Sequence, residues 1–480
     1  MRGLTAHSGG GLPKPDCCNI SQRSAHRTTQ GEANAAPHHP ATWYAQTAVA
    51  AREWPALTFD LDTDVCVVGG GLAGITIARE IARRGWSVAL IEAGRIAGEA
   101  SGRNTGFVLP GYGQDAHRLV ERCGLDHAKA LWALSEEGVA YVRNTILGLA
   151  MPGVDPADGW LSVSTHINAD QVMRTLTLLA QGFGAEVEGW PVERVREALR
   201  SDCYFHGLHF PKAFHIHPLN YALGLAADAE RRGARLFEQT RALEMDPLGV
   251  RKRITTPSAK IRANHIVLAG NVNLGGIARD LAATVLPMTT YVAVTQPVGY
   301  LTEAVAFTGA VSDSRGVDHQ YRIVDWDRLM WSTGATAWVG DPRRYGDRIK
   351  ASIARIYPRL RGVEIAHAWS GTMGFAVHRM PQIGEIAPGL WVASAFGRHG
   401  INTTAIAGEL IARALVDHDD AWRLFLPYDL VWAGGRLGRT VLQADVWARR
   451  AGDRVRAGLA RKRRAAAQVG ESVPATQPDA

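Results

Sequence analysis

The sequence lacks the features that mark membrane-spanning and secreted chains. It contains no run of about 18 or more consecutive apolar residues, which a transmembrane helix requires. The first 40 residues lack the apolar centre of a secretory signal. Cysteine is scarce, with five residues and no CxxC pair, so neither a disulfide framework nor a cysteine zinc site is expected. These absences predict a soluble, cytoplasmic protein with reduced thiols and no transmembrane segment.

The size and composition are those of a globular protein with at least two domains. The chain has 480 residues, whereas a single hydrophobic core rarely exceeds roughly 250–300 residues. Its hydrophobic fraction of 46% and charged fraction of 21% are near globular averages. The formal net charge is +7, but much of the excess lies in the run from Arg449 to Arg464, so a tail and not the folded body carries it.

The two ends of the chain differ in composition from the part between them. Residues 1–41 are rich in Ser, Thr, Gly, Pro and His and have almost no apolar periodicity, which predicts a disordered N-terminal extension. Ordered structure is expected to begin near Trp43. Residues 431–480 are expected to form a basic C-terminal tail. That tail has few aromatic residues to stack on bases, so no nucleic acid partner is expected.

Strand and helix patterns alternate between these ends. Residues 64–68 form a short valine-rich run, typical of a parallel strand buried on both faces. Residues 73–84 have apolar residues at helical spacing, Gly85 marks the end of that helix, and residues 87–91 predict the next strand. The alternation continues with expected helices over 221–232 and 404–416 and expected strands over 235–243, 265–269, 291–295, 329–333 and 390–395. The pattern predicts an α/β fold.

The turn between the first strand and the first helix carries a G-x-G-x-x-G pattern at Gly69, Gly71 and Gly74. Gly69 allows a tight turn, Gly71 lets the backbone approach a pyrophosphate, and Gly74 permits close packing of the helix on the strand. Glu92 stands at the end of the next strand, where it can accept hydrogen bonds from a ribose. This acidic residue disfavours NADP. The motif predicts dinucleotide binding and leaves NAD and FAD open.

The stretch 92–106, EAGRIAGEASGRNTG, resembles the segment after the second strand in the D-amino-acid oxidase (DAO) family of FAD-dependent oxidoreductases, where this loop runs under the flavin. The resemblance covers roughly residues 43–430, and the gamma-glutamylputrescine oxidoreductase-like proteins are the nearest branch. The other segments that carry it are HPL at 217–219, IVLAGN at 266–271, WSGT at 369–372, RMPQIG at 379–384 and FGRHGI at 396–401.

The resemblance implies an α/β fold in which a Rossmann-like FAD/NAD(P)-binding domain carries an inserted mixed β-sheet (α+β) substrate domain. The FAD-binding domain is expected to be discontinuous and to comprise residues 43–112, 214–286 and 366–430. The substrate domain is expected to comprise residues 113–213 and 287–365.

The resemblance also implies FAD as the cofactor. Relatives with covalent flavin attach it to a histidine where this chain has Arg103, or to a cysteine near the end of the fold, whereas the last cysteine here is Cys203. Noncovalent FAD is therefore expected. The residues expected to bind it are Gly69, Gly71, Leu72, Ala73, Gly74, Glu92, Ala93, Arg95, Ser101, Gly102, Arg103, Asn104, Thr105, Leu243, Ala269, Gly270, Asn271, Gly397, Arg398, Gly400 and Ile401.

The expected reaction is oxidation of the C–N bond of a small-molecule amine by hydride transfer to flavin N5, which gives an imine. The amino-acid oxidases of the family bind the substrate carboxylate through an arginine, and here that position is Met373. An amine, a polyamine derivative or an N-substituted amino acid is therefore favoured over a simple α-amino acid. Arg379 or Arg322 could bind a carboxylate from another direction, and His399 could adjust amine protonation. His399 and Arg379 are the candidate catalytic residues.

Other functions stay open from the sequence. An NAD-dependent dehydrogenase would share the first glycine motif but would not need the loops at 101–105 and 397–401. A flavin-bearing RNA-binding or modification protein would use the basic tail. Oxygen and an electron carrier are both open as the electron acceptor. No metal site is expected, because a histidine cluster without carboxylates or cysteines at metal-site spacing indicates a histidine-rich strand edge; its members are His206, His209, His215 and His217.

Overall fold

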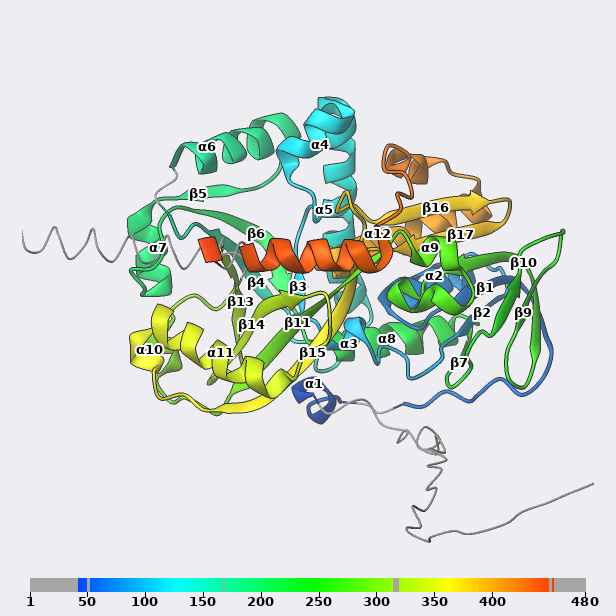
Figure 1. Ribbon diagram of the computed structural model, residues 1–480, viewed down its shortest axis with the longest axis horizontal. Coiled ribbons are helices and arrows are strands. Elements are labelled where there is room, and N and C mark those ends of the chain that lie inside the picture. The colour runs from blue at the N-terminus through cyan, green and yellow to red at the C-terminus, as the bar shows by residue number, and fades with distance from the viewer. Residues whose placement is uncertain (1–41, 50–51, 167–168, 314–318, 449–450, 453–480) are drawn as a thin grey trace, which may run out of the picture. The chain divides into compact units, whose positions relative to one another are not determined.

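A computed structural model describes residues 42–49, 52–166, 169–313, 319–448 and 451–452. Two β-sheets with helices packed on them make up this part of the chain (Figure 1). The predicted N-terminal extension 1–41 and nearly all of the chain after residue 448 lie outside the described residues. No helix within the described ranges is long and apolar enough to cross a membrane.

The first sheet is built around five parallel strands. Its strands lie in the order β16 (Gln382–Ala387), β17 (Leu390–Ser394), β10 (Lys260–Leu268), β1 (Leu61–Val68), β2 (Val88–Ile91) and β7 (Arg235–Phe237), and the hairpin of β8 (Glu244–Asp246) and β9 (Lys252–Thr255) pairs with β10. In the central register, Val68 lies opposite both Leu268 and Ile91. The last four residues of β1 are all buried, which accounts for its apolar sequence.

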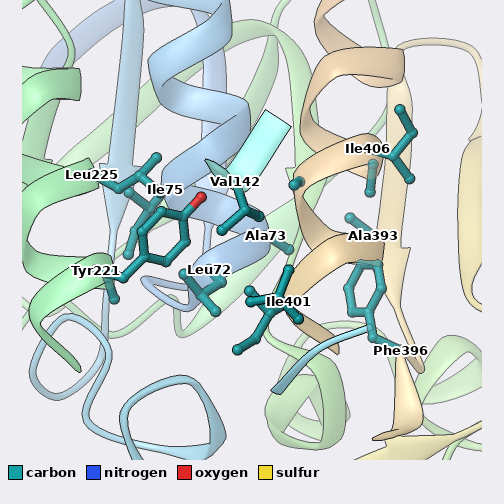
Figure 2. Packing of buried hydrophobic residues seen from close by; sticks show 14 of the residues in the cluster. Leu72, Ala73, Ile75, Val142, Tyr221, Leu225, Ala393, Phe396, Ile401 and Ile406 are labelled. Carbon is teal, nitrogen blue, oxygen red and sulfur yellow. The ribbon is translucent and has the colours of Figure 1, made fainter. Parts of the chain in front are cut away.

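Four helices pack together beside the first sheet. They are α2 (Leu72–Arg83), α5 (Leu125–Gly148), α8 (Pro218–Arg231) and α12 (Gly400–Ala412). α12 packs against both α2 and α5, and α2 packs against α8. Figure 2 shows the apolar side chains that meet there, among them Ile75, Tyr221 and Ile406. This buried cluster fixes the position of α2, the helix that follows the glycine turn.

The second sheet is mixed. Its strands lie in the order β15 (Ile365–Phe375), β11 (Leu286–Thr295), β14 (Arg328–Thr336), β13 (Gln320–Val324), β12 (Ala310–Asp313), β4 (Ala157–Val163), β6 (Gly207–His215) and β3 (Phe107–Val108), with β5 (Glu188–Trp190) also paired to β6. β12 and β4 are parallel. α11 (Pro342–Ile356) packs on β11, β14 and β15, and beneath it Trp331 stacks on Tyr321 with ring centroids 4.2 Å apart.

Shorter helices connect these layers. They are α1 (Trp43–Gln46), α3 (Ala100–Arg103), α4 (Ala116–Cys123), α6 (Ala169–Thr177), α7 (Val192–Leu199), α9 (Arg279–Ala282) and α10 (Leu301–Ala304). A further helix, residues 435–448, follows the body of the fold and is drawn in orange-red in Figure 1. The expected tail therefore begins with an ordered helix.

Three expected boundaries differ from the structure. The strand expected over 235–243 ends at Phe237, because Gln239 adopts a left-handed backbone with φ of 49° and turns the chain out of the sheet. The helix expected over 404–416 begins earlier, at Gly400, and its last turn is a π-helix. The domain boundary expected at 366 falls inside β15, which pairs with β11 of the second sheet.

Candidate cofactor and active site

The glycine turn between β1 and α2 closes on itself so tightly that side chains are excluded. Gly69 has φ of 119°, and a Cβ there would lie 2.7 Å from the backbone carbon of Ala269. A Cβ on Gly74 would lie 1.9 Å from the carbonyl oxygen of Gly69. The turn therefore delivers the N-terminus of α2, whose first amides have no partner within the helix, to a ligand. This is the geometry that binds a pyrophosphate.

Glu92 lies beside this turn at the end of β2. Its two carboxylate oxygens accept hydrogen bonds from the backbone N–H groups of Gly70 and Gly94, each at 2.7 Å. Burial raises the pKa of Glu92, and these two hydrogen bonds oppose that effect. The carboxylate is thus held at the end of β2, where its remaining lone pairs can accept hydrogen bonds from a ribose hydroxyl.

A loop that contains α3 joins the turn to the second sheet. Ser101 Oγ accepts a hydrogen bond from the backbone N–H of Leu72 at 2.9 Å, which ties the loop to the first turn of α2. Arg103 donates from Nε to the carbonyl of Gly98 at 2.9 Å and from an Nη atom to the carbonyl of Ser370 at 3.2 Å. The loop is therefore anchored at both ends by hydrogen bonds.

A cavity of about 120 Å³ begins at Leu72 and extends between the loop and the second sheet. Many of its lining residues come from segments that the sequence assigned to the cofactor: Leu72, Ser101, Arg103, Asn104, Thr105, Asn271, Gly397, Arg398, Gly400 and Ile401. Leu72 and Ile401 also belong to the apolar cluster of Figure 2, together with Phe396, which lines the cavity as well. One wall of the cavity is thus continuous with the core under α2 and α12.

The opposite wall comes from the second sheet, and of its residues only Met373 was singled out from the sequence. It includes Thr290, Val292, Gln320, Ser332, Thr333 and Met373. Ser332 lies opposite Val292 on one side and Gln320 on the other, so these three form a row across β11, β14 and β13. Period-two alternation along each strand places residues on a face, but only the register between strands places this row at the cavity.

The cavity has a cationic lining. Within the described ranges, its only charged lining side chains are Arg103 and Arg398, both half-buried, and no Asp or Glu belongs to the lining. The remaining polar groups there are neutral hydroxyls and amides, such as those of Ser332 and Gln320. The site therefore favours a ligand group with negative charge over a polycation.

The two candidate catalytic residues do not reach the cavity. His399 is not part of the lining; its ring lies edge-on to Trp160 at 6.4 Å, and burial lowers its pKa to about 4, so it is neutral near pH 7. Arg379 is also absent from the lining and is exposed, because its left-handed backbone, with φ of 62°, turns it to the surface. The catalytic roles expected for His399 and Arg379 therefore stay predictions.

Arg322, the other expected carboxylate partner, is buried behind the cavity wall. It donates to Nδ1 of His215 at 2.6 Å, to the carbonyl of Ile216 at 2.9 Å and to the hydroxyl of Tyr44 at 3.1 Å. It does not line the cavity. These hydrogen bonds connect Arg322, which lies on β13, to α1 and to the residue that follows β6.

The other residues expected to bind the cofactor lie around the turn, with one exception. Gly69, Gly71, Ala73, Gly74 and Glu92 form or border the turn; Ala269 and Gly270 close against Gly69; Gly102 packs on Ala97; and Ala93 and Arg95 follow Glu92. Leu243 is the exception: its side chain is 46% exposed, and its backbone N–H donates to Thr255 at 2.8 Å. The backbone amide of Leu243 is thus paired with the last residue of β9, and its expected role in cofactor binding stays a prediction.

Comparison with known proteins gives a consistent picture. Residues 64–414 match the DAO family, described as FAD dependent oxidoreductase. The gamma-glutamylputrescine oxidoreductase of Escherichia coli (strain K12) is 28% identical over 418 residues, which is 85% of this chain and 96% of that protein. The probable oxidoreductase OrdL of Rhizobium meliloti (strain 1021) is 30% identical over 377 residues, which is 77% of this chain and 87% of that protein.

A more distant relative and two solved structures extend the comparison. The bifunctional protein MnmC of tRNA 5-methylaminomethyl-2-thiouridine biosynthesis from Burkholderia pseudomallei (strain 668) is 30% identical over 396 residues, 75% of this chain and 58% of that protein. Glycine oxidase from Geobacillus kaustophilus superposes with a TM-score of 0.64 at 22% identity, over 75% of this chain and 96% of that one. L-proline dehydrogenase from P. horikoshii does so with a TM-score of 0.65 at 18% identity, over 78% and 99%. These structures confirm the fold class expected from the sequence.

Proposed function

Because the chain belongs to the DAO family of FAD-dependent oxidoreductases, we propose that it oxidises the C–N bond of an amine that also carries a carboxylate. The observation that supports this substrate class is the charge of the cavity lining, which has two arginines and no carboxylate among the described residues. Free polyamines are polycations, so this lining repels them. An amine that bears a carboxylate has an anionic group that an arginine can bind.

The residues of the site fit FAD. The glycine turn has no room for a Cβ at Gly69 or Gly74. Such a turn is required for the close approach of a pyrophosphate and for tight packing of the helix. The cavity continues from the first residue of α2 to the second sheet, so the residues that would hold a dinucleotide and those of the second sheet border the same cavity. We assign FAD binding to the turn, to Glu92 and to the loop residues Ser101, Gly102, Asn104 and Thr105. When bound, FAD accepts a hydride from the carbon next to the substrate nitrogen, which leaves an imine.

We further propose that the flavin is held noncovalently. The described cysteines Cys66, Cys123 and Cys203 are free and do not line the cavity. Arg103 stands at the loop position where some relatives carry the attaching histidine. Free cysteines also suit the expected cytoplasmic location, which stays a prediction.

The chain's own residues would bind and orient the substrate. Arg398 and Arg103 would pair with the carboxylate, and the hydroxyl and amide groups of Ser332 and Gln320 would orient the amine by hydrogen bonds. Nearby cationic charge lowers the pKa of a bound ammonium group, and this favours the neutral amine from which hydride leaves. His399 would support the Phe396–Ile401 loop rather than exchange protons with the substrate.

The similarity to a gamma-glutamylputrescine oxidoreductase supports this substrate class, because the substrate in that protein's name is an amine joined to a carboxylate-bearing glutamyl group. A pure amine substrate would have no use for two arginines in the lining. A simple α-amino acid is less suitable, because Met373 lines the cavity where the family's carboxylate-binding arginine is expected.

The test is anaerobic reduction of the bound flavin by a panel of amines. N-γ-glutamyl amines, N-carboxymethyl amines, free diamines and D-amino acids would be added to the purified flavoprotein while flavin absorbance is recorded. We expect the carboxylate-bearing amines to bleach the flavin and Arg398→Gln to raise their KM by about 10–100-fold. Arg118→Gln, on the exposed face of α4, is the matched control and should change nothing.

Each contrary outcome overturns a different part of the proposal. Bleaching by free diamines, unaffected by Arg398→Gln, would overturn the carboxylate requirement. Bleaching by no amine would overturn the reaction itself.

Two further measurements concern the electron acceptor and the flavin attachment. Peroxide formation in air would distinguish oxygen from a separate electron carrier as acceptor. Acid precipitation of the protein should release the flavin into the supernatant if attachment is noncovalent.

A further inference from the structure

The helix at residues 435–448 has one face fixed against the body of the fold. Gln443 and Val446 are buried on this face, with exposures of 3% and 4%. Gln443 Oε1 accepts a hydrogen bond from the backbone N–H of Ala337 at 3.0 Å. Just before the helix, Ala433 donates to the carbonyl of Ala283 at 2.8 Å. These contacts determine which of its side chains point away from the protein.

The outward face of the same helix is also apolar. Leu437 is 75% exposed and Val441 is 69% exposed, and Ala444 and Ala448 are exposed as well. The spacing i, i+4, i+7 and i+11 places these four side chains in one stripe along the helix. An ordinary surface helix is apolar on one face only, so the second stripe needs a separate explanation.

Tryptophans stand beside this stripe. Trp447 is 62% exposed on the helix itself, and Trp432 is 66% exposed just before it. Trp338, 49% exposed, follows the residue that donates to Gln443, and Val339 next to it is 70% exposed. Tryptophan is enriched where proteins meet the interface between lipid and water, because its ring is apolar and its N–H group is polar.

The charge around the stripe is positive. Arg436 and Arg439 are exposed on the helix, whose one acid, Asp445, is half-buried. Immediately after it, residues 449–464 contain eight Lys or Arg and one acid, Asp453, which equals the whole net charge of +7 of the chain. An exposed apolar helix face followed by a cationic segment matches the sequence pattern of helices that lie in anionic membrane interfaces.

We propose that the helix at 435–448, together with Trp338 and Trp432, is a docking surface for an anionic lipid bilayer. The attachment would be peripheral, with the helix lying along the interface. Lipid is favoured over nucleic acid because Leu437 and Val441 are aliphatic and cannot stack on bases. It is favoured over a second copy of the chain because a symmetric contact would bring Arg436 and Arg439 of both copies together.

The test is co-sedimentation of the full-length flavoprotein with lipid vesicles. Vesicles of phosphatidylcholine alone would be compared with vesicles that contain about one quarter phosphatidylglycerol. The apolar variant is Leu437→Ser with Val441→Ser. Its matched control is Leu248→Ser with Val250→Ser, two side chains that are 78% and 86% exposed near the β8–β9 hairpin. The charge variant replaces Arg461, Lys462, Arg463 and Arg464 by Gln.

We expect the wild type and the control to bind the anionic vesicles and not the neutral ones. The apolar variant should lose binding by about tenfold or more, because the buried apolar area supplies much of the affinity. The charge variant should bind more weakly and with less dependence on salt. Retained flavin absorbance in each variant shows that the fold is intact.

Three results would overturn the proposal. The first is an absence of binding to anionic vesicles at low salt, or equal binding by the apolar variant. The second is salt-dependent binding to transfer RNA that the charge variant loses and the apolar variant keeps, which would assign the segment to nucleic acid. The third is a dimer in solution that the apolar variant dissociates, which would assign the stripe to a second copy.

Discussion

Arg322 donates a hydrogen bond to Nδ1 of His215 across 2.6 Å, and both side chains are 4% exposed. Nδ1 can accept this bond only when it carries no proton, so the imidazole is neutral. Burial and, next, the Arg322 charge lower the pKa of His215 to about 3. A buried arginine is thus paired through its two Nη atoms with a neutral ring, a carbonyl and a hydroxyl instead of a carboxylate, and its Nε has no partner among the described residues.

The first prediction concerns the planar, fork-shaped guanidinium group of Arg322. Arg322→Lys keeps the charge but cannot reach His215, Ile216 and Tyr44 together, so at least one buried acceptor loses its donor. We expect the free energy of unfolding to fall by about 1–3 kcal/mol, measured by urea denaturation at pH 7. Arg343→Lys, at an exposed position, is the matched control and should have no effect. Equal stability of the two variants would show that the fork is dispensable.

His217 determines the pH dependence of stability. It caps α8, and its Nδ1 accepts from the backbone N–H of Asn220 at 3.1 Å. Burial and then the Arg322 charge lower its pKa from 6.5 to about 4. Because the unfolded chain takes up this proton near pH 6.5 and the folded chain near pH 4, the stabilisation is complete above pH 6.5 and is lost as the pH falls toward 4.

We therefore expect stability to fall by about 1.4 kcal/mol per pH unit in this window for His217 alone. His217→Asn keeps a capping side chain without a titrating group, so the decline between pH 6.5 and 5 should become shallower. His418→Asn, at an exposed helix end, is the matched control. Urea midpoints measured from pH 7.5 to 5 would check this, and parallel slopes for all three proteins would contradict it.

The glycine turn allows a graded test of cofactor binding. A Cβ at Gly74 would lie 1.9 Å from the Gly69 carbonyl, so Gly74→Ala should weaken both folding and FAD binding. A Cβ at Gly71 would meet only Ser101 Oγ, at 3.0 Å, so Gly71→Ala should fold but bind FAD at least about tenfold more weakly because it intrudes on the phosphate position. Gly148→Ala, with nothing within 4 Å, should affect neither property. Flavin absorbance per protein and FAD titration are the measurements.

Local sequence patterns were enough to predict the elements around the glycine turn. β1, the glycine turn, α2 and β2 follow one another along the chain, and each has its own periodicity or turn residue. The left-handed turn at Gln239 and the β8–β9 hairpin, which Leu243 directly precedes, depend on contacts beyond the local pattern. Arg379 has a left-handed backbone and an exposed side chain, which no motif reveals, and its expected role stays a prediction.

The wall of the cavity that the second sheet forms could not be predicted in the same way. Thr290, Gln320 and Ser332 are ordinary strand residues, and they gain a common function only through the pairing of β11, β14 and β13. That register depends on how the whole second sheet packs, which single-strand alternation does not specify. The outward stripe of the 435–448 helix was not predicted for the same reason, because tertiary packing decides which face of a helix is buried. Only once the buried face is located can the exposed apolar face be identified.

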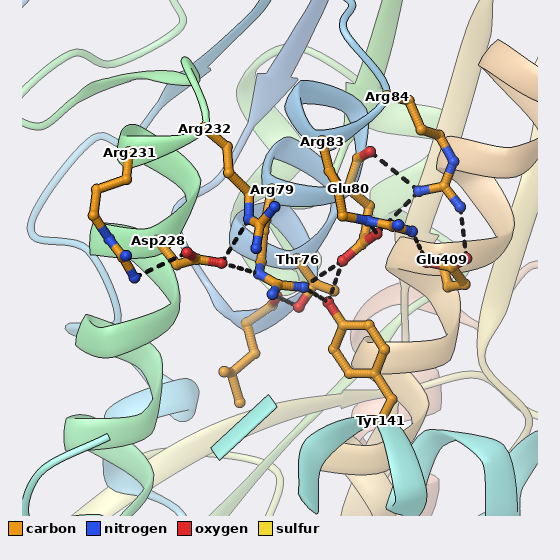
Figure 3. Close-up of polar contacts among 11 residues, drawn as sticks. Thr76, Arg79, Glu80, Arg83, Arg84, Tyr141, Asp228, Arg231, Arg232 and Glu409 are labelled. Atoms are coloured by element: carbon orange, nitrogen blue, oxygen red, sulfur yellow. Dashed lines mark hydrogen bonds and ion pairs between the residues drawn. The ribbon is translucent and has the colours of Figure 1, made fainter. Parts of the chain in front are cut away.

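Glu80 determines the last prediction. Its side chain is 1% exposed on α2 and accepts hydrogen bonds from the Tyr141 hydroxyl at 2.6 Å, from Arg83 at 2.6 Å and from Arg84 at 2.9 Å (Figure 3). Arg79, 9% exposed, bonds to both Glu80 and Asp228 of α8. Burial alone would raise the pKa of Glu80, but hydrogen bonds from Tyr141 and the arginines hold it well below its ordinary value.

Glu80→Gln preserves the shape of this side chain and removes its charge, which leaves the guanidinium groups of Arg79 and Arg84 underneutralised in the interior. Breaking one partner of a buried ion pair costs about 3–5 kcal/mol, so we expect a loss of that size in urea denaturation at pH 7. Glu121→Gln, exposed on α4, is the matched control. Because the folded pKa of Glu80 is depressed, its stabilisation is present above pH 4.5 and declines as the pH falls below that value. The difference in free energy of unfolding between wild type and Glu80→Gln should therefore narrow in acid. A constant difference would mean that the loss of stability comes from packing and not from charge.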